Sequence, residues 1–412
     1  MGESGKNVLV VGGGVAGTAA ALRLAEGGLR VYLVEREPFV GGQAVLFACK
    51  AADRCTACGV CLLPEMLSRM ATHPQISVFT CSTLIGLTKG EGGFRAVIRQ
   101  RRYIDPERCI ACGLCLEACP AAAIQAPSPE AVPYAYFIEE DKCLLLKGEG
   151  CEICREICPT GAVAFDRSPE CLELDVDAII VATGFEAFDA RQKASLGYGL
   201  YPNVLTGLDL ERIFYREGTL KLSDGGQPKD IAFVQCVGSR DESLRRGYCS
   251  RVCCKYAVRF ARLIKHLDPE ANVTVFYIDL QTAGKGFAEF FEECRNSIRF
   301  VRGIPVEVTG ASDGKLRVRF EDLGLGRQLE EAFDLVVLSV GISPRRGNWE
   351  LARILGLNLD EFGFFEAKDG VETDVEGIFL AGTCQGPKDI PESIAHGAAA
   401  AERAMERMAC RR

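Results

Sequence analysis

The 412-residue chain is poor in three features, and each absence narrows the classes of protein to consider. No apolar run approaches the ~20 residues that span a bilayer, and the N-terminus lacks the basic and apolar regions of a signal peptide. A net charge of −8 offers no basic surface to nucleic acid. Histidine occurs only three times, which leaves few partners for zinc sites that mix histidine with cysteine. We therefore expect a soluble, cytoplasmic protein of two or three domains.

Cysteine, by contrast, occurs 21 times, and its positions are clustered. A reducing compartment argues against structural disulfides, so clustered thiols favour metal binding. Sites made of thiolates alone suit iron–sulfur clusters. We therefore expect iron–sulfur chemistry, and the surrounding sequence indicates where each cluster lies.

The N-terminal segment has the pattern of a dinucleotide-binding unit. A β-branched run at 7–11 precedes GGGVAG and a helical run, and Gly12, Gly14 and Gly17 fit GxGxxG. These glycines permit a tight turn, close approach of a pyrophosphate and close packing of helix on strand. The next expected strand ends at Glu35, whose carboxylate can accept from a ribose hydroxyl. An ordinary glycine-rich turn is the alternative, and the complete strand–turn–helix–strand order favours the nucleotide.

Three later segments indicate that the nucleotide is FAD. GGQ at 41–43 follows the ribose-binding strand, DAIIVATG at 177–184 predicts a strand and turn, and EGIFLAG at 376–382 precedes an alanine-rich helix. Together they resemble the corresponding motifs of the thioredoxin-reductase-like flavoproteins. The resemblance implies a pair of dinucleotide-binding α/β folds. It also implies further FAD contacts from Arg36, Gly42, Gln43, Ala182, Thr183, Gly184, Gly382, Gln385 and Ile394.

A duplicated cysteine motif interrupts this flavoprotein pattern. The first copy has C-x2-C-x2-C-x3-C-P spacing, and the second has the same plan with a longer first gap. This is the spacing of bacterial two-cluster ferredoxins, in which the fourth cysteine of each copy ligates the other cluster. Paired zinc knuckles fit the repeat and its two Cys-Pro ends less well. We therefore assign two [4Fe–4S] clusters, one to Cys109, Cys112, Cys115 and Cys158, and the other to Cys143, Cys151, Cys154 and Cys119.

A further group of cysteines follows the GGQ segment. Cys49, Cys55, Cys58 and Cys61 lie in CKAADRCTACGVC, whose core has the form of a cluster-binding turn. A zinc knuckle or a set of reactive thiols is the alternative, and Cys81 competes with Cys49 as the fourth ligand. We expect another cluster here, close to the flavin.

A second strand–loop–helix–strand pattern begins at Pro228, but its phosphate turn is missing. No GxGxxG occurs between 228 and 345, so direct NAD(P)H binding is not expected there. The segment instead carries Cys236, Cys249, Cys253 and Cys254. Adjacent cysteines make a strained disulfide, and buried apolar thiols are the other alternative. We favour four cluster ligands, with Cys249 and Cys253 on one helical face at i, i+4 and a helix N-terminus that stabilises the thiolates.

Taken together, QCVGSRD, YCSRVCC, the ferredoxin insert and CQGPKDIPESIA resemble the A subunit of heterodisulfide reductase. The resemblance implies an FAD-containing electron-transfer hub with a cluster on the four second-domain cysteines. Its partners would be a hydrogenase, formate or NAD(P)H donor module, a disulfide-reducing B/C pair and, in bifurcating members, ferredoxin. It leaves room for a homodimer within a larger complex. Lys388 is a candidate for a cation near the flavin, and a solvated loop lysine is the alternative.

The predicted order of domains follows from these segments. We expect an FAD-binding domain in three parts, a two-cluster ferredoxin insert, and a degenerate NAD-type domain that carries the further cluster. Two functions compete with flavin-based electron bifurcation: a non-bifurcating subunit that feeds a quinone module, and a stand-alone NAD(P)H-dependent disulfide reductase. The boundaries are 1–101, 169–227 and 346–412 for the FAD-binding domain, 102–168 for the insert and 228–345 for the NAD-type domain.

Overall fold

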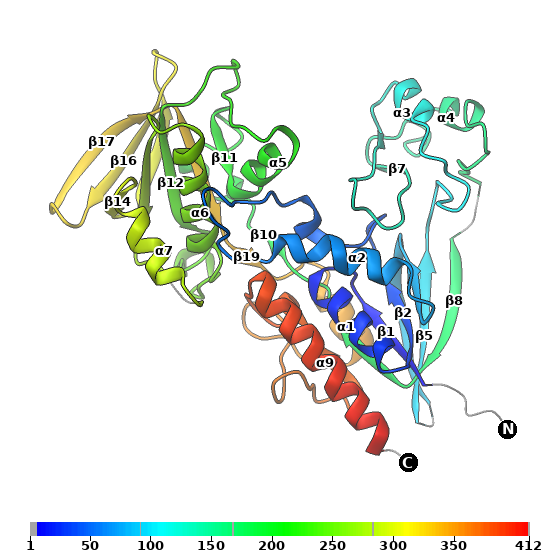
Figure 1. The fold of residues 1–412 in the computed structure, drawn as a ribbon. Helices are drawn as coiled ribbons and strands as arrows, with labels where there is room; N and C mark the ends of the chain where they lie inside the picture. Colours follow the sequence, from blue (N-terminus) through cyan, green and yellow to red (C-terminus); the bar gives the residue numbers. More distant parts are fainter. Residues whose placement is uncertain (1–5, 91, 167–168, 282–283, 411–412) are drawn as a thin grey trace.

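The computed structural model describes residues 6–90, 92–166, 169–281 and 284–410. Two parallel sheets form two α/β domains, and a small loop-rich insert stands as a separate lobe on the first of them (Figure 1). In the described parts of the chain, no helix combines the length and the apolar character needed to cross a bilayer.

The first domain is built on five parallel strands in the order β20–β9–β1–β2–β3. Alternate residues of β1 face opposite sides of the sheet, as the period of a strand requires. Val8 and Val10 pack under the helices α1 and α9, while Leu9 and Val11 pack against an antiparallel sheet, β4–β5–β8. The bounds are β1 Asn7–Val11, β2 Arg30–Val34, β3 Ile76–Phe79, β9 Ala178–Val181, β20 Ile378–Leu380, α1 Val15–Glu26, α9 Ile390–Cys410, α2 Leu63–Ala71, β4 Ser82–Gly90, β5 Gly93–Gln100, β8 Glu170–Val176 and α8 Asn348–Leu355.

The second domain repeats this plan with the strand order β11–β18–β12–β13–β14. Ile231 and Phe233 of β12 pack against α5, α6 and α7, and Ala232 and Val234 face a β-meander. Because β11 pairs with β18, the second sheet recruits residues upstream of the boundary predicted at 228. The bounds are β11 Val204–Thr206, α5 Gly207–Glu217, β12 Asp230–Val237, α6 Cys253–Leu267, β13 Asn272–Tyr277, α7 Phe287–Cys294, β14 Arg299–Arg302, β18 Leu335–Val340 and, in the meander, β15 Pro305–Gly310, β16 Leu316–Asp322 and β17 Arg327–Phe333.

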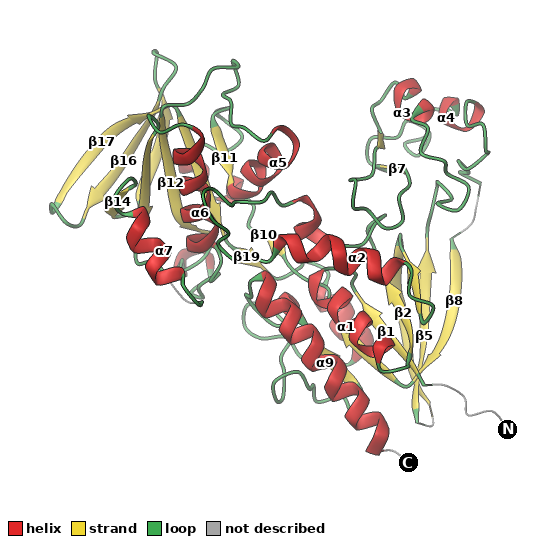
Figure 2. Ribbon diagram, in the orientation of Figure 1, coloured by secondary structure: helices red, strands yellow, loops and turns green. Residues whose placement is uncertain are grey.

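A short antiparallel ribbon, β10 with β19, lies between the two domains and pairs Glu186–Ala187 with Ile342–Ser343. The insert follows β5 and is mostly loop, with two short helices and one small ribbon (Figure 2). Its core is a small apolar cluster that includes Ile104, Ile124 and Val163, so its cysteine-rich loops have little other packing to hold them. The elements are α3 Leu114–Ala118, α4 Ile153–Glu156, β6 Ile124–Gln125 and β7 Phe137–Ile138.

Candidate functional site

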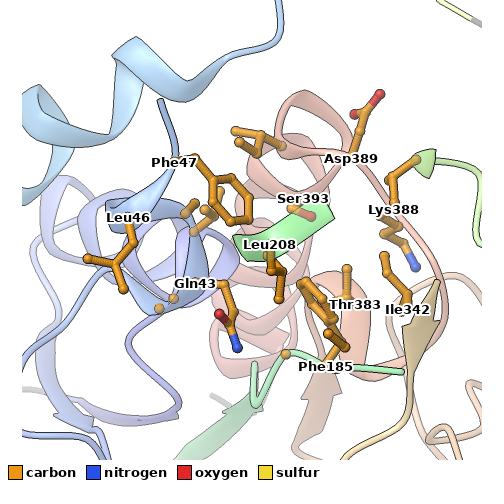
Figure 3. Close-up of a pocket in the computed structure, with 18 of the residues that line it drawn as sticks. Gln43, Leu46, Phe47, Phe185, Leu208, Ile342, Thr383, Lys388, Asp389 and Ser393 are labelled. Carbon is orange, nitrogen blue, oxygen red and sulfur yellow. The ribbon is translucent and has the colours of Figure 1, made fainter. Parts of the chain in front are cut away.

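The main candidate site is a cavity of ≈ 390 Å³ between the two domains. The first domain supplies the glycine turn and the start of α9, and the second supplies Tyr256 and Ile342. Figure 3 shows Gln43, Phe47, Phe185, Leu208 and Thr383 converging on this space. A largely apolar cleft at a domain junction with a few polar groups is the usual form of a cofactor site.

Two glycines at the turn between β1 and α1 have no room for a side chain. A Cβ at Gly12, where φ is +107, would lie 2.4 Å from the Ala182 carbonyl oxygen, and one at Gly17 would lie 1.9 Å from the Gly12 carbonyl oxygen. Gly14 caps α1 without any side-chain bond, so the first amides of the helix remain free for an anion. Any side chain at Gly12 or Gly17 would therefore clash with the backbone. The turn as a whole has the form that binds a pyrophosphate.

Glu35 lies directly after β2, and its side chain is buried. Its carboxylate accepts from the Gly13 amide at 2.7 Å and from the Glu37 amide at 2.9 Å. Burial raises the pKa of Glu35, and the two amide bonds oppose that rise. Because the group lines the cavity beside the glycine turn, it is placed to accept from a ribose hydroxyl, as the sequence predicts.

The other residues predicted to contact FAD divide into two sets. Gly42, Gln43, Ala182, Thr183 and Gly184 line the cavity, and the buried Thr183 hydroxyl has no hydrogen-bond partner in the described ranges. An orphaned buried polar atom on the wall indicates a ligand that would satisfy it. The remaining predicted residues do not line the cavity, namely Arg36, Gly382, Gln385 and Ile394.

Gly382 and Gln385 lie next to the cavity wall without lining it. The Gly382 amide donates to His396 Nδ1 at 2.8 Å, and the Gln385 side chain accepts from Lys388 Nζ at 3.0 Å. Lys388 itself is on the cavity wall, and Figure 3 shows its side chain extending toward Ile342. Its side chain is half-buried, and this burial lowers its pKa.

Sequence reasoning missed a buried ion pair on the same wall. Lys50 Nζ lies 2.6 Å from Glu211 Oε1, and only 3% and 6% of the two side chains are exposed. Lys50 also lies over the Phe260 ring, at 4.9 Å from its centre. The pair joins the loop after GGQ to helix α5 of the second domain. The sequence could have indicated this ion pair only through the lysine directly after Cys49, because Glu211 is distant in sequence.

In the ferredoxin insert, the eight predicted ligands gather around two separate voids. One void is lined by Cys109, Cys112, Cys115 and Cys158, and the other by Cys119, Cys143, Cys151 and Cys154. Each void thus takes one cysteine from the other copy of the repeat. The amides of Ala123 and Ala162 donate to Cys119 and Cys158 Sγ, both at 3.3 Å, so the two Cys-Pro ends have the same local geometry.

The four second-domain cysteines meet at the N-terminus of α6. The Cys253 thiol lies beside both Cys236 and Cys254, and its proximity lowers the pKa of each, in the case of Cys254 to about 7. Cys236 sits at a bulge of β12 with φ +59, which is uncommon outside glycine. α6 begins at Cys253, so Cys249 lies in the preceding loop and the expected shared helical face does not form. Arg251, at φ +62, interrupts the helix before it reaches Cys249.

Cysteine spacing distinguishes a cluster from a single ion. Within residues 6–90, 92–166, 169–281 and 284–410, no three Cys, His, Asp or Glu side chains converge closely enough to hold one metal ion. Zn–S bonds of ≈ 2.3 Å require closely converging thiolates, whereas ligands that surround a void suit a larger inorganic cluster. Each ferredoxin void is lined by three cysteines of one copy and one of the other, which is the ligand pattern of a two-cluster ferredoxin.

Solved structures similar in fold are thioredoxin reductases. The Lactococcus lactis enzyme aligns with a TM-score of 0.55 at 18% identity and covers 98% of this chain and 99% of its own. The T. acidophilum enzyme aligns with a TM-score of 0.54 at 15% identity, covering 97% and 98%. These likenesses confirm the expected fold class, two thioredoxin-reductase-like α/β domains.

Family models match three parts of the chain. An FAD dependent oxidoreductase model matches residues 7–57, a 4Fe-4S binding domain matches 102–125, and a pyridine nucleotide-disulphide oxidoreductase model matches 247–401. They support FAD and iron–sulfur as cofactors. Fold, cavity and cysteine voids together define an oxidoreductase of the flavoprotein class with an iron–sulfur insert.

The curated relatives are more specific. The chain is 40% identical over 421 residues to the A subunit of H(2):CoB-CoM heterodisulfide,ferredoxin reductase from Methanothermobacter marburgensis, and covers 63% of that protein. It is 36% identical over 429 residues to the A subunit of Ferredoxin:CoB-CoM heterodisulfide reductase from Methanosarcina mazei, and covers 53% of it. These alignments include 96% and 98% of this chain. The chain is therefore a homologue of the heterodisulfide reductase A subunits and spans 53% to 63% of the length of these two relatives.

Proposed function

We propose that this chain is the FAD- and iron–sulfur-containing electron-transfer subunit of a heterodisulfide-reductase-type complex. The observation that carries this proposal is the cavity itself. One wall is a dinucleotide turn, and the facing wall comes from a domain whose phosphate-binding turn is replaced by cysteines. A flavin held there would have Cys58 on its cavity wall and would face a domain that carries cysteines at the start of α6.

FAD supplies the conversion between two-electron and one-electron chemistry when it is bound. The chain positions and insulates that cofactor. The glycine turn and Glu35 hold the pyrophosphate and ribose, Phe47, Phe185 and Leu208 exclude water, and Lys388 places a cation at the inner wall. Hydrogen bonds to cysteine sulfur, such as those from Ala123 and Ala162, raise the potential of a cluster relative to one without them.

The partners we propose follow the relatives. One is named as an H(2)-dependent heterodisulfide and ferredoxin reductase, and another as a ferredoxin-dependent one. We expect a donor module of the hydrogenase, formate or NAD(P)H type, a B/C pair that reduces a disulfide, and ferredoxin as a second acceptor. In flavin-based bifurcation, reduction of the disulfide supplies the free energy for reduction of ferredoxin by the same donor.

Acceptor dependence in the intact complex tests bifurcation. With donor present, ferredoxin should be reduced only when the disulfide acceptor is also present, because the favourable branch drives the unfavourable one. Ferredoxin reduction at the same rate without the disulfide acceptor would contradict bifurcation. A complete lack of ferredoxin reduction would contradict it as well, and either result would support a simple electron-transfer subunit.

The match to pyridine nucleotide-disulphide oxidoreductases favours one rival, a stand-alone NAD(P)H-dependent reductase. Stopped-flow mixing of the isolated chain with NADPH separates the two. We expect no prompt bleaching of the flavin, because the β12–α6 connection lacks a phosphate turn. Prompt bleaching without any partner would support the rival.

Cluster content tests the second-domain site. Total iron should be ~12 to 16 per chain for three or four [4Fe–4S] clusters. Cys253→Ala should remove ~4 of these and leave FAD bound, since the glycine turn belongs to the other domain. Unchanged iron in this variant would contradict the cluster assignment at α6.

A further inference from the structure

The turn that carries Cys55, Cys58 and Cys61 repeats the backbone of the first ferredoxin turn. CTACGVC corresponds to CIACGLC at 109–115. Ala57 has φ 51 where Ala111 has φ 53, and Gly59 has φ 83 and ψ −2 where Gly113 has φ 84 and ψ −12. Alanine at positive φ is uncommon. The same strained alanine followed by the same glycine, in two distant segments, indicates two turns shaped for one kind of ligand.

The segments after the two turns are also alike. A helical segment begins directly after the glycine in both, at Val60 in one and at Leu114 in the other. In the first ferredoxin turn this geometry directs three cysteines at a common void. The Ala57 amide donates to Cys55 Sγ at 3.4 Å, a bond of the type that stabilises thiolate sulfur. The local structure is therefore that of a cluster-binding loop outside the ferredoxin insert.

A positive charge from the second domain faces this turn. Arg259 of α6 donates to the Thr56 carbonyl at 2.9 Å, and its buried Nε has no hydrogen-bond partner within the described part of the chain. Thr56 directly follows Cys55, so the guanidinium lies against the cysteine turn. A buried guanidinium beside thiolates offsets the negative charge of an iron–sulfur cluster.

The turn also forms part of the cavity wall. Cys58 lines the cavity, whereas none of the described cysteines of the ferredoxin insert or of the α6 group does. A Cβ on Gly59 would lie 3.0 Å from Ile390 and 3.1 Å from Pro391, so the turn packs directly on the start of α9. A cluster at this turn would thus lie closer to the bound cofactor than one in either ferredoxin void.

Two cysteines, Cys49 and Cys81, are candidates for the fourth ligand of this cluster, and their positions differ. Cys81 is half-buried and lines a different cavity, with Arg102 and Tyr103, on which none of the three turn cysteines lies. Cys49 is exposed between two buried neighbours, Ala48 and Lys50, so it faces away from the cavity. Cys55 and Cys61 are exposed as well.

We propose that Cys55, Cys58 and Cys61, with Cys49 as the fourth ligand, hold a [4Fe–4S] cluster that exchanges electrons directly with the flavin. The cluster accepts one electron at a time from reduced flavin and passes it to an electron-accepting partner protein. The site itself stands on the turn geometry, and its role beside the flavin rests on the proposed function.

Iron and flavin content of the anaerobically purified chain test the site. Cys58→Ser and, separately, Cys49→Ser should each lower iron by ~4 per chain, and Cys49→Ser, whose side chain faces away from the cavity, should leave FAD content unchanged. Cys171→Ser is the matched control, because Cys171 is an exposed thiol of β8 outside every cysteine group. If Cys58→Ser yields no soluble protein, Cys61→Ser replaces it, since Cys61 is exposed and lies outside the cavity wall. Full iron in the Cys58 and Cys61 variants, or zinc in place of iron in the parent, would overturn the site. Full iron in Cys49→Ser would overturn that ligand.

A second measurement separates this proposal from the function on which it rests. After flavin photoreduction, the reduced-flavin absorbance of Cys58→Ser should decay several-fold more slowly than that of the parent, at equal FAD content. Equal decay in a variant that has lost the iron would refute direct exchange with the flavin. A parent chain that binds iron but no FAD would instead refute the proposed function and leave the cluster site standing.

Discussion

Breaking the Lys50–Glu211 pair should destabilise the junction between the two domains far more than breaking a surface pair. Both side chains are at least 94% buried, so Glu211→Gln leaves an ammonium ion uncompensated in an apolar setting beside Phe260. Removing one partner of such a pair costs about 3–5 kcal/mol. Arg299→Gln is the control, because Arg299 and Glu331 form an exposed pair with the same 2.6 Å separation, worth about 0–1 kcal/mol.

Lys50→Met should behave differently from Glu211→Gln as pH changes. Burial raises the pKa of Glu211, and Lys50 opposes that rise. Without the lysine, the folded state therefore binds a proton more readily than the unfolded state, and stability recovers as pH falls through the folded pKa of Glu211 toward its unfolded pKa. Glu211→Gln should show no such recovery. The double variant should cost less than the sum of the two single variants.

Urea unfolding followed by circular dichroism and by flavin release measures these changes. The reasoning about this pair is refuted if Glu211→Gln costs no more than Arg299→Gln. It is also refuted if the two single variants add without coupling.

Two further changes probe the nucleotide wall. Gly17→Ala should abolish FAD retention and keep the iron of the insert, because its Cβ would lie 1.9 Å from the Gly12 carbonyl oxygen; the FAD-to-iron ratio of the purified protein checks this. His396 should make the fold acid-sensitive, because burial lowers its pKa from 6.5 to about 4. The unfolded state then takes up the proton first, so stability is complete above pH ~6.5 and falls by about 1–2 kcal/mol toward pH ~4, after discounting for partial exposure. His396→Asn, which keeps an acceptor for the Gly382 amide, should flatten this slope in thermal melts, and an unchanged slope would assign it to other groups.

Local patterns in the sequence predicted the first domain and the insert well. The β1 turn, the strand that ends before Glu35, and the crossed cysteine sets all depend on short-range spacing, which fixes backbone geometry within a few residues. The second wall of the cavity could not be predicted in this way. Tyr256, Glu211 and Arg259 reach the site only because α5 and α6 pack against the loop after GGQ. The wrong expectation for Cys249 has a local cause, the left-handed conformation of Arg251, for which arginine gives no sequence signal.

The connection from β12 to α6 keeps the strand–loop–helix order of a nucleotide-binding unit and carries cysteines where a phosphate turn would lie. A phosphate turn needs a glycine that leaves space for the ligand. Gly238 follows β12 at φ +78, but a Cβ there would lie 2.0 Å from the Phe188 ring, so that glycine serves internal packing. The helix start that would bind phosphate presents Cys253 and Cys254 instead, both almost fully buried. The positive end of α6 is therefore directed at thiolates, and it favours a negatively charged cluster for the same reason that it would favour phosphate. This placement of two buried cysteines at the start of α6 is why we propose a cluster, and not a phosphate group, at this position.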